Sequence, residues 1–284
     1  METPLDELVR LLDLTPDGDD VWLGDQTAQA VATRHVFGGM VLAQALRAAA
    51  STVAPERAVH SLHASFLRAG DAGAPLRLEV ARLRDGRRFS HRRVSVRQER
   101  GVLCEALIAF AAPWERPALE HGPRMPRVPA ADTLPTDEAM LADHPEVPLL
   151  LRTTGPIDQR YVDHPQLARD AGRGLADVEV WMRADGTLPD DPVLHACVAV
   201  YASDLGPLEP VGARHALSMR ARDLTPTSLD HAVWFHSPVR ADAWMLAILD
   251  SPWAGHGRGM GRVAVFQDGV LALEVAQEGL LELP

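Results

Sequence analysis

The stretch FGGMVLAQALRAAAS (37–51) opens with an aromatic residue and two glycines, and then carries small or apolar residues on almost every side. A second stretch of the same character, DDPVLHACVAVYASD (190–204), lies in the other half of the chain. Its Asp191 is placed to cap a helix, and Pro192 suits a first helical turn. Because a helix without a polar face must be buried on most sides, the sequence predicts two enclosed helices.

Strand-like runs accompany both helices. After the first helix they cover 57–68, 75–84, 91–98 and 102–110, and around the second they cover 178–186, 228–236, 242–249, 261–267 and 270–277. One curved antiparallel sheet can enclose an apolar helix. We therefore predict an α+β fold of the double hotdog type, with two curved antiparallel sheets, each wrapped around a long central apolar helix.

Two short matches relate the halves of the chain. His63-Ala64 recurs as His231-Ala232, and the Gly-Val-Leu of 101–103 recurs at 269–271, both at a spacing of 168 (231 − 63 and 269 − 101). With the repeated order of elements, these matches indicate an internal duplication. We expect an N-terminal hotdog domain over 1–114, a proline-rich connecting segment with a short helix over 115–170, and a C-terminal hotdog domain over 171–284 that carries the active site.

Composition excludes several classes of function. The chain has 39 acidic and 28 basic residues, and this acidic balance argues against a nucleic-acid partner. Every basic residue is Arg, and neither Lys nor Asn occurs, which excludes a lysine Schiff base, a Walker A lysine and a Cys-His-Asn triad. There is no G-x-S-x-G, CxxC or HExxH motif, so neither an elbow serine nor a metal is indicated.

The chain shows no sign of export or membrane insertion. The acidic N-terminal run METPLDELVRLLDL does not match a signal peptide, and no run approaches the roughly 18 apolar residues of a membrane span. Cys104 and Cys197 lie in apolar runs, as buried free thiols do. We expect a cytoplasmic protein without a membrane partner.

Three polar residues lie where polarity is unusual. Asp204 closes the second apolar helix, where burial and the helix dipole both disfavour a negative charge, and this suits a general base. Gln277 shares a strand face with apolar residues, and Ser228 begins a strand. Each also has a plainer interpretation: a solvated helix end for Asp204, a strand emerging into solvent for Gln277, and a turn or cap for Ser228.

Longer motifs resemble the type II acyl-CoA thioesterases. They are HVFGGMVLAQAL (35–46), VHSLHASFLRAGD (59–71), LRDGRRFSHRRVSV (83–96), VWMRADGTLPDD (180–191), YASD (201–204), SLDHAVWFH (228–236) and FQDGVLALEVAQEG (266–279). The resemblance implies a double hotdog that hydrolyses fatty acyl-CoA to free fatty acid and CoA without a cofactor, as a homodimer or homotetramer. It implies a catalytic trio of Asp204, Ser228 and Gln277, which would activate a water for direct attack on the thioester. Ser228 replaces the usual threonine and keeps its hydroxyl.

Substrate contacts are expected at both ends of the ligand. Backbone N–H groups near Gly39 and Met40 would stabilise the oxyanion, although Met40 stands where the family often has Gln. Arg88 and Arg93, in a cluster with Arg87 and Arg92, are candidates to bind the CoA phosphates, with a solvated turn as the alternative.

A spacing of 168 places His60 and Ala109 opposite Ser228 and Gln277, so we predict one site per chain. Two other functions remain open at this stage: a hotdog enoyl-CoA hydratase, and an acyl-CoA-binding protein without catalysis.

Overall fold

The computed structural model describes residues 2–27, 30, 36–114, 116–144, 155–219 and 223–283. The first half contains α1 (Pro4–Leu11), β1 (Thr15–Pro16), β2 (Val21–Gly24), α3 (Gly38–Ala50), β3 (Ala58–Phe66), β4 (Leu76–Asp85), β5 (Phe89–Gln98) and β6 (Gly101–Ala111). The connecting region holds η1 (Ala131–Thr133), α4 (Asp137–Met140), β7 (Ile157–Tyr161) and α6 (Pro165–Asp170). The second half contains β8 (Asp177–Ala184), α7 (Pro192–Ser203), α8 (Glu209–Ala213), β9 (Thr225–Ser228), β10 (Asp230–Phe235), β11 (Met245–Gly255), β12 (Arg258–Gln267) and β13 (Val270–Glu282).

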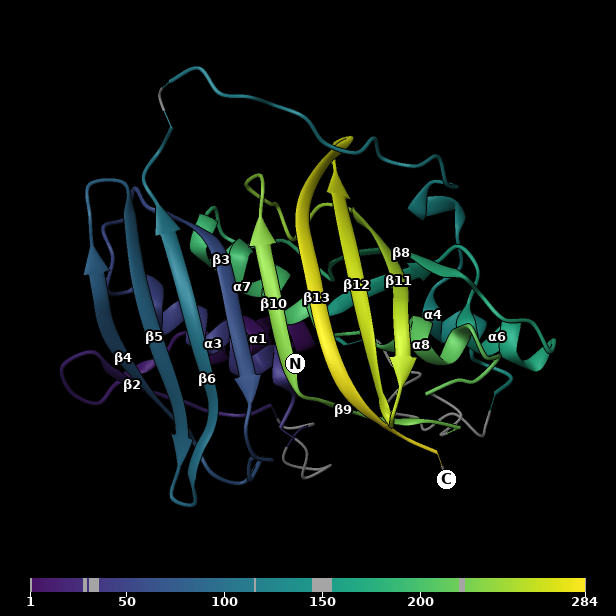
Figure 1. Ribbon diagram of the computed structural model, residues 1–284, viewed down its shortest axis with the longest axis horizontal. Coiled ribbons are helices and arrows are strands. Elements are labelled where there is room, and N and C mark those ends of the chain that lie inside the picture. Colours follow the sequence, from purple (N-terminus) through teal and green to yellow (C-terminus); the bar gives the residue numbers. More distant parts are fainter. Residues whose placement is uncertain are drawn as a thin grey trace.

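The strands form one antiparallel sheet rather than the two predicted sheets. Its order is β1-β2-β4-β5-β6-β3-β10-β13-β12-β11-β8-β7, with β9 paired to β13. The two halves have the same strand order when each is read from its outer edge inward. In this order, β2, β4, β5, β6 and β3 of the first half correspond to β8, β11, β12, β13 and β10 of the second half. The halves join where β3 pairs with β10, and Figure 1 shows the sheet running unbroken across that junction. Without this pairing, β3 and β10 would each be an edge strand with unpaired backbone N–H and C=O groups. Pairing them satisfies the backbone groups of both strands.

Both predicted buried helices lie on the same face of this sheet, behind the strands in Figure 1. Helix α3 contacts β4, β5 and β6, and α7 contacts α3 and β3. Every residue of α7 from Leu194 to Ser203 is buried, and so is nearly all of α3. This confirms the prediction drawn from their lack of a polar face. Among the described residues, no helix is long and apolar enough to cross a membrane.

The repeat spacing is one residue longer in the strands than the sequence matches indicated. His231 pairs with Ala64, and Ala232 pairs with His63, so the matched histidines point to opposite faces of the sheet. Buried positions correspond at a spacing of 169: Leu62 with His231 (231 − 62) and Ile108 with Gln277 (277 − 108). Irregular register between Val96 and Arg97 and between Val265 and Phe266 accompanies this change.

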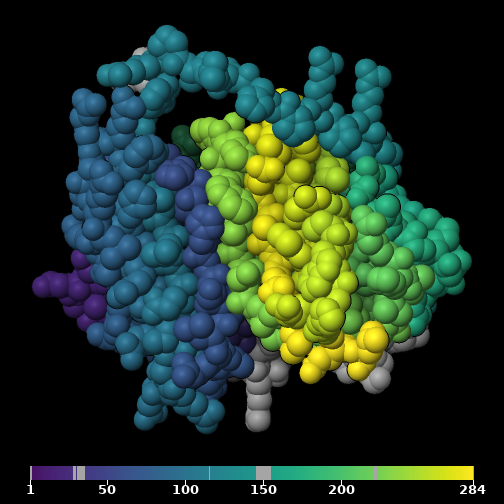
Figure 2. Space-filling view, in the orientation of Figure 1, coloured from purple at the N-terminus to yellow at the C-terminus, as the bar shows by residue number. Residues whose placement is uncertain are grey.

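The described residues of the connecting segment contain more secondary structure than the predicted short helix. From the end of β6 the segment passes along one end of the strands, at the top of Figures 1 and 2, and β7 then pairs with the outer edge of β8. The predicted short helix near 137–143 corresponds to α4, whereas β7 and α6 were not predicted. Strand β7 is short and gains its stability from pairing with β8, a long-range contact that a local sequence pattern does not show.

Candidate active site

The three candidate catalytic residues come from three different elements. Asp204 is the C-cap residue of α7, and its side chain is only 5% exposed. Ser228 ends the short strand β9 and pairs with Gly279 of β13. Gln277 lies on β13, where strand alternation turns it toward the helices, and it is 2% exposed. The plainer interpretations of Asp204 and Gln277 as solvated ends therefore do not fit the structure.

A fourth residue links these three. The Gln277 Nε2 atom donates a hydrogen bond of 2.5 Å to the Ser228 Oγ atom. The His231 Nδ1 atom lies 2.8 Å from Gln277 Oε1 and 3.7 Å from Asp204 Oδ1. The chain thus gathers a carboxylate, a hydroxyl, an amide and an imidazole around one buried point, although they are up to 73 residues apart in sequence (277 − 204).

Two glycines of the first half allow this gathering. A Cβ atom at Gly38 would lie 2.7 Å from Asp204 Oδ2, so only a glycine lets the carboxylate lie against the start of α3. A Cβ at Gly39 would lie 2.6 Å from the Tyr201 carbonyl oxygen, so Gly39 allows the N-terminus of α3 to approach α7. The rings of Phe37 and Tyr201 pack edge to face beside this contact, with centroids 5.0 Å apart.

The start of α3 presents one of the two expected oxyanion donors. Phe37 is the N-cap residue and provides no side-chain cap. The Met40 N–H donates to the Phe37 carbonyl oxygen at 3.1 Å, so this N–H is already used within the first turn of the helix. The Met40 side chain is buried. The Gly39 N–H forms no hydrogen bond within the described chain. The positive end of the helix dipole therefore faces the Asp204 region with an open donor.

The described residues of the first half contain no equivalent set of polar groups. Its helix α3 ends at Ser51, in the position that Asp204 holds at the end of α7. In the strands, Leu62 and Ile108 take the places of His231 and Gln277. A spacing of 169 replaces Ala109 by Ile108 as the equivalent of Gln277 (277 − 169), and His60 by Val59 as the equivalent of Ser228 (228 − 169). The equivalents of Asp204, Ser228 and Gln277 are thus Ser51, Val59 and Ile108, which supports a single site per chain.

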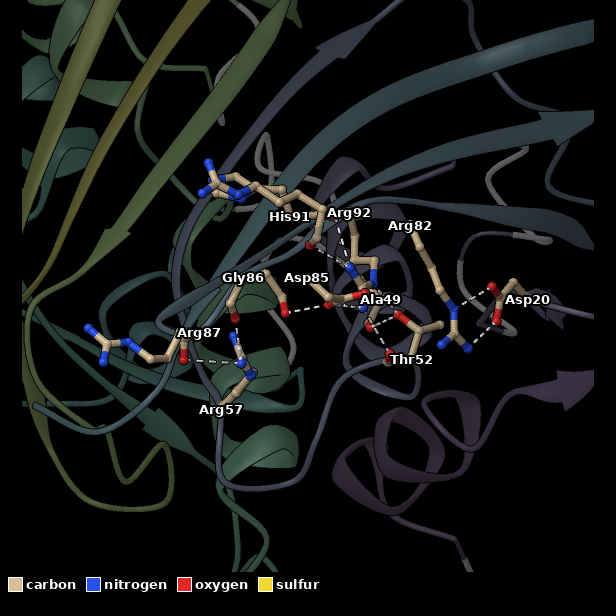
Figure 3. Close-up of polar contacts among 12 residues, drawn as sticks. Asp20, Ala49, Thr52, Arg57, Arg82, Asp85, Gly86, Arg87, His91 and Arg92 are labelled. Atoms are coloured by element: carbon tan, nitrogen blue, oxygen red, sulfur yellow. Dashed lines mark hydrogen bonds and ion pairs between the residues drawn. The ribbon is translucent and has the colours of Figure 1, made fainter.

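The four arginines that were grouped in sequence do not form one surface. Strand alternation separates Arg92, 1% exposed and turned toward α3, from Arg93, which points to the opposite face. Arg92 bonds to both Thr52 oxygens, to Asp85 and to the carbonyls of Arg84 and His91. Figure 3 shows the Arg87 side chain leading away from this network. Arg92 is therefore a structural cross-link and not a ligand for phosphate.

Arg93 and Arg88 lie beside two different hollows. Arg93 forms an ion pair of 3.9 Å with Glu105 and lines a hollow of about 830 Å³ that Gln277 and His231 also line. The Arg88 guanidinium lies 4.4 Å from the centre of the Trp114 ring, beside a smaller hollow of about 310 Å³ at the β4–β5 turn. Arg93 therefore shares a hollow with Gln277, whereas Arg88 lines a separate one.

The sequence singled out His231 only through its match with His63, so its place in the site was not predicted. A signal was present: alternation along β10 puts His231 on the inner face with Val233 and Phe235, so it is a polar residue among apolar ones. The same reasoning had singled out Gln277. Burial lowers the pKa of His231 from 6.5 to about 4, so the imidazole is neutral at neutral pH.

This burial predicts a pH-dependent loss of stability. In the unfolded chain His231 takes up a proton near pH 6.5, but in the folded chain only near pH 4, so acid favours unfolding in that window. We expect the free energy of unfolding to fall by about 3 kcal/mol between pH 6.5 and 4 because of this group. Urea unfolding at several pH values, compared with His231→Asn, measures it. If the free energy of unfolding of His231→Asn falls with pH as steeply as that of the wild-type protein, His231 is not the group responsible.

The remaining expectations concern metals and cysteines. Among the described residues, no group of three or more His, Cys, Asp or Glu side chains could hold a metal ion. Cys104 and Cys197 are buried free thiols, as predicted, and burial raises the pKa of each to about 12. Neither thiol is ionised at neutral pH, so neither is a nucleophile.

The chain matches known protein families and curated relatives. Residues 27–111 match the acyl-CoA thioesterase N-terminal domain, and residues 151–280 match the family described as acyl-CoA thioesterase. Acyl-coenzyme A thioesterase 8 of Homo sapiens is 35% identical over 96% of this chain and 88% of its own length. Acyl-CoA thioesterase 2 of Haemophilus influenzae is 30% identical over 99% of both chains.

Solved structures agree with these relatives. Acyl-CoA thioesterase II TesB2 of Mycobacterium marinum superposes with a TM-score of 0.78 and 34% identity, over 98% of this chain and 97% of that one. A protein of Alicyclobacillus acidocaldarius described as having a hot dog fold superposes with a TM-score of 0.77 at 22% identity, over 98% of both chains, which shows the shared fold alone.

The fold and the relatives together define a hotdog-fold thioesterase, a hydrolase of thioesters. Within that class, the chain belongs to the type II acyl-CoA thioesterase family.

Proposed function

We propose that this protein hydrolyses fatty acyl-CoA to free fatty acid and CoA at the cluster of Asp204, Ser228 and Gln277. The observation that carries the proposal is the partly buried Gln277–Ser228 hydrogen bond of 2.5 Å, with Asp204 Oδ1 3.7 Å from the His231 nitrogen that contacts Gln277. Buried polar groups without a function are costly, because each must be paired within the protein. Membership of the thioesterase family supports the same assignment.

The trio would act on a water molecule. The Ser228 oxygen accepts from the Gln277 amide, so its own hydroxyl proton is free to be donated to the water oxygen. Asp204 accepts a proton from the water as its oxygen attacks the thioester carbonyl carbon. Ser228 and Gln277 hold the water in line and place no charge beside it, which limits the cost of positioning.

The N-terminus of α3 would act in the next step, in which the tetrahedral intermediate forms. The Gly39 N–H and the positive end of the helix dipole would stabilise the oxyanion of the tetrahedral intermediate. The carbon–sulfur bond then breaks, the acid is released, and the CoA thiolate takes the proton that Asp204 received. Ser228 is not an acylated nucleophile in this scheme, because its partner is an amide and not a base.

The organisation of the chain follows from the same proposal. We infer that 1–114 and 171–284 are two hotdog units around α3 and α7, with 115–170 connecting them and the second unit carrying the trio. The first unit contributes Gly38 and Gly39 to the site, which explains why one unit alone would not suffice. The expected cytoplasmic location and homodimer or homotetramer belong to this proposal.

Thiol release from a panel of acyl-CoA substrates tests the function. We expect the wild-type protein to release thiol, and Gln277→Ala to lower kcat about 10²-fold because the water loses its support. Ser228→Ala should also lower kcat, whereas Ser228→Thr, which keeps the hydroxyl, should stay within about 5-fold of wild type. Thermal unfolding of each variant controls for loss of fold.

The same assay separates the competing functions. A hydratase would change absorbance at the enoyl band without releasing thiol. A binding protein without catalysis would retain acyl-CoA and release none. Full kcat in both Gln277→Ala and Ser228→Ala would remove these residues from the mechanism even if the wild-type protein is a thioesterase.

A further inference from the structure

His231 lies at the centre of the site but takes no part in the mechanism above. Its side chain is fully buried, with Nδ1 at 2.8 Å from Gln277 Oε1 and Nε2 at 2.9 Å from Ser203 Oγ. Both ring nitrogens are thus engaged by groups of the protein. No nitrogen is left to contact a substrate, so His231 is not placed to be a general base for the water.

The hydrogen bonds define where the imidazole proton lies. An amide oxygen only accepts, so Nδ1 must carry the proton that bridges to Gln277 Oε1. The neutral ring has a single N–H, so Nε2 presents a lone pair. The Ser203 hydroxyl can donate to that lone pair, and it also lies 2.8 Å from the Val200 carbonyl oxygen, with which it shares its proton.

This bond determines which way the Gln277 amide faces. Once Oε1 is bonded to His231, the amide nitrogen is the atom left to face Ser228. If the amide turned over, its oxygen would face Ser228 and would take up the hydroxyl proton. Ser228 could then no longer donate to the water. Rotation of a terminal amide costs little by itself, so a specific partner is needed to prevent it.

We propose that His231 is a positioning residue, which donates its Nδ1–H to Gln277 and thereby keeps the Ser228 hydroxyl proton available for the attacking water. The role rests on the proposed hydrolysis at Asp204, Ser228 and Gln277. Ser203 supports it from behind by holding the other edge of the ring.

The order Ser203, His231 and Asp204 resembles a nucleophilic triad, but its geometry does not suit one. Ser203 is 5% exposed, and the cavity beside it measures about 10 Å³, too small for a thioester. The carboxylate lies 3.7 Å from Nδ1, beyond hydrogen-bond distance, while Gln277 occupies that nitrogen. Ser203→Ala distinguishes the two roles: a positioning role predicts a loss of kcat below about 10-fold, whereas loss of a nucleophile would abolish turnover.

A pair of amide substitutions tests the positioning role. In His231→Asn the amide nitrogen is as many bonds from Cα as Nδ1, so it can still donate to Gln277. In His231→Gln the amide reaches instead to the position of Nε2, beside Ser203. We expect kcat of His231→Asn to stay within about 5-fold of wild type and that of His231→Gln to fall about 10- to 100-fold, with KM little changed in both.

The ratio between these variants is then measured again in a Gln277→Ala background. With no amide left to orient, we expect the ratio to fall to about 1. Equal kcat for the two variants in the native background, or an unchanged ratio in the second background, would overturn the proposal and leave His231 as a packing residue. Wild-type thiol release is the separate test of the function itself.

A measurement without substitutions covers the case in which neither variant folds. Nitrogen NMR of the wild-type protein labelled at its histidines reports the tautomer of His231 directly. We expect a neutral ring with the proton on Nδ1 between about pH 6 and 8, consistent with its lowered pKa. A proton on Nε2 instead would mean that the Gln277 amide faces the other way, which would refute the proposed orientation.

Discussion

Asp204→Asn should lower kcat for acyl-CoA hydrolysis by about 10³-fold, within the range in which a positioned general base contributes to a rate. Asparagine keeps the size and most hydrogen bonds of the side chain but does not accept a proton from water. KM should change little, because the carboxylate contacts the attacking water and not the body of the substrate. Steady-state thiol release at several acyl-CoA concentrations measures both quantities.

An exposed carboxylate of the same region serves as the control. Asp190 lies at the start of the same helical stretch, with its side chain 91% exposed and paired to Arg240. Asp190→Asn should leave kcat unchanged, because an exposed ion pair contributes little and lies far along α7 from Asp204. If Asp204→Asn retains kcat to within about 3-fold while folding normally, Asp204 is not the base.

Gly38→Ala is expected to have the second largest effect, although it adds one methyl group in the other half of the chain. The new Cβ would lie 2.7 Å from Asp204 Oδ2 and 3.0 Å from the edge of the Phe66 ring, well inside ordinary contact distance. The carboxylate must move by several tenths of an ångström or more. A displacement near 1 Å at a catalytic group costs about 10²-fold in rate, and we expect a loss of that order in kcat.

Two other glycines help to interpret this result. Gly122→Ala adds a methyl group where no atom lies within 4 Å, and it should leave kcat and stability unchanged. Gly39→Ala meets the Tyr201 backbone at 2.6 Å, so it should destabilise the contact between α3 and α7 as well as reduce activity. Near wild-type kcat in Gly38→Ala, with normal thermal unfolding, would show that Asp204 tolerates displacement and would weaken the mechanism.

The elements of the fold could be predicted because their patterns are local. The apolar stretches 37–51 and 190–204 became α3 and α7, and both are buried, since a helix without a polar face is stable only when enclosed. Strand alternation and the turn residues between runs indicated most of the strands. The short strand β7 was missed, because its stability comes from a neighbour that is distant in sequence.

The candidate site was predictable in part for a similar reason. Asp204 and Gln277 were singled out because they were polar among apolar residues, and both are indeed buried. His231 is also a polar residue among apolar ones, but it was considered only as part of the internal repeat. The four clustered arginines do not form one surface, because adjacent residues on a strand face opposite sides: Arg92 is buried against α3 while Arg93 points outward.

The sequence by itself determined most of the helices and strands, the burial of both long helices, and two of the polar residues in the candidate site, Asp204 and Gln277. These follow from periodicity and burial, which are properties of short stretches. Only the tertiary structure decided that the two halves share one sheet, that Gly38 of the first half lies against Asp204 of the second, and that His231 lies between Gln277 and Ser203. Such relations depend on strand register and on the close approach of two helices, and a shift of one residue reverses the face on which every side chain lies.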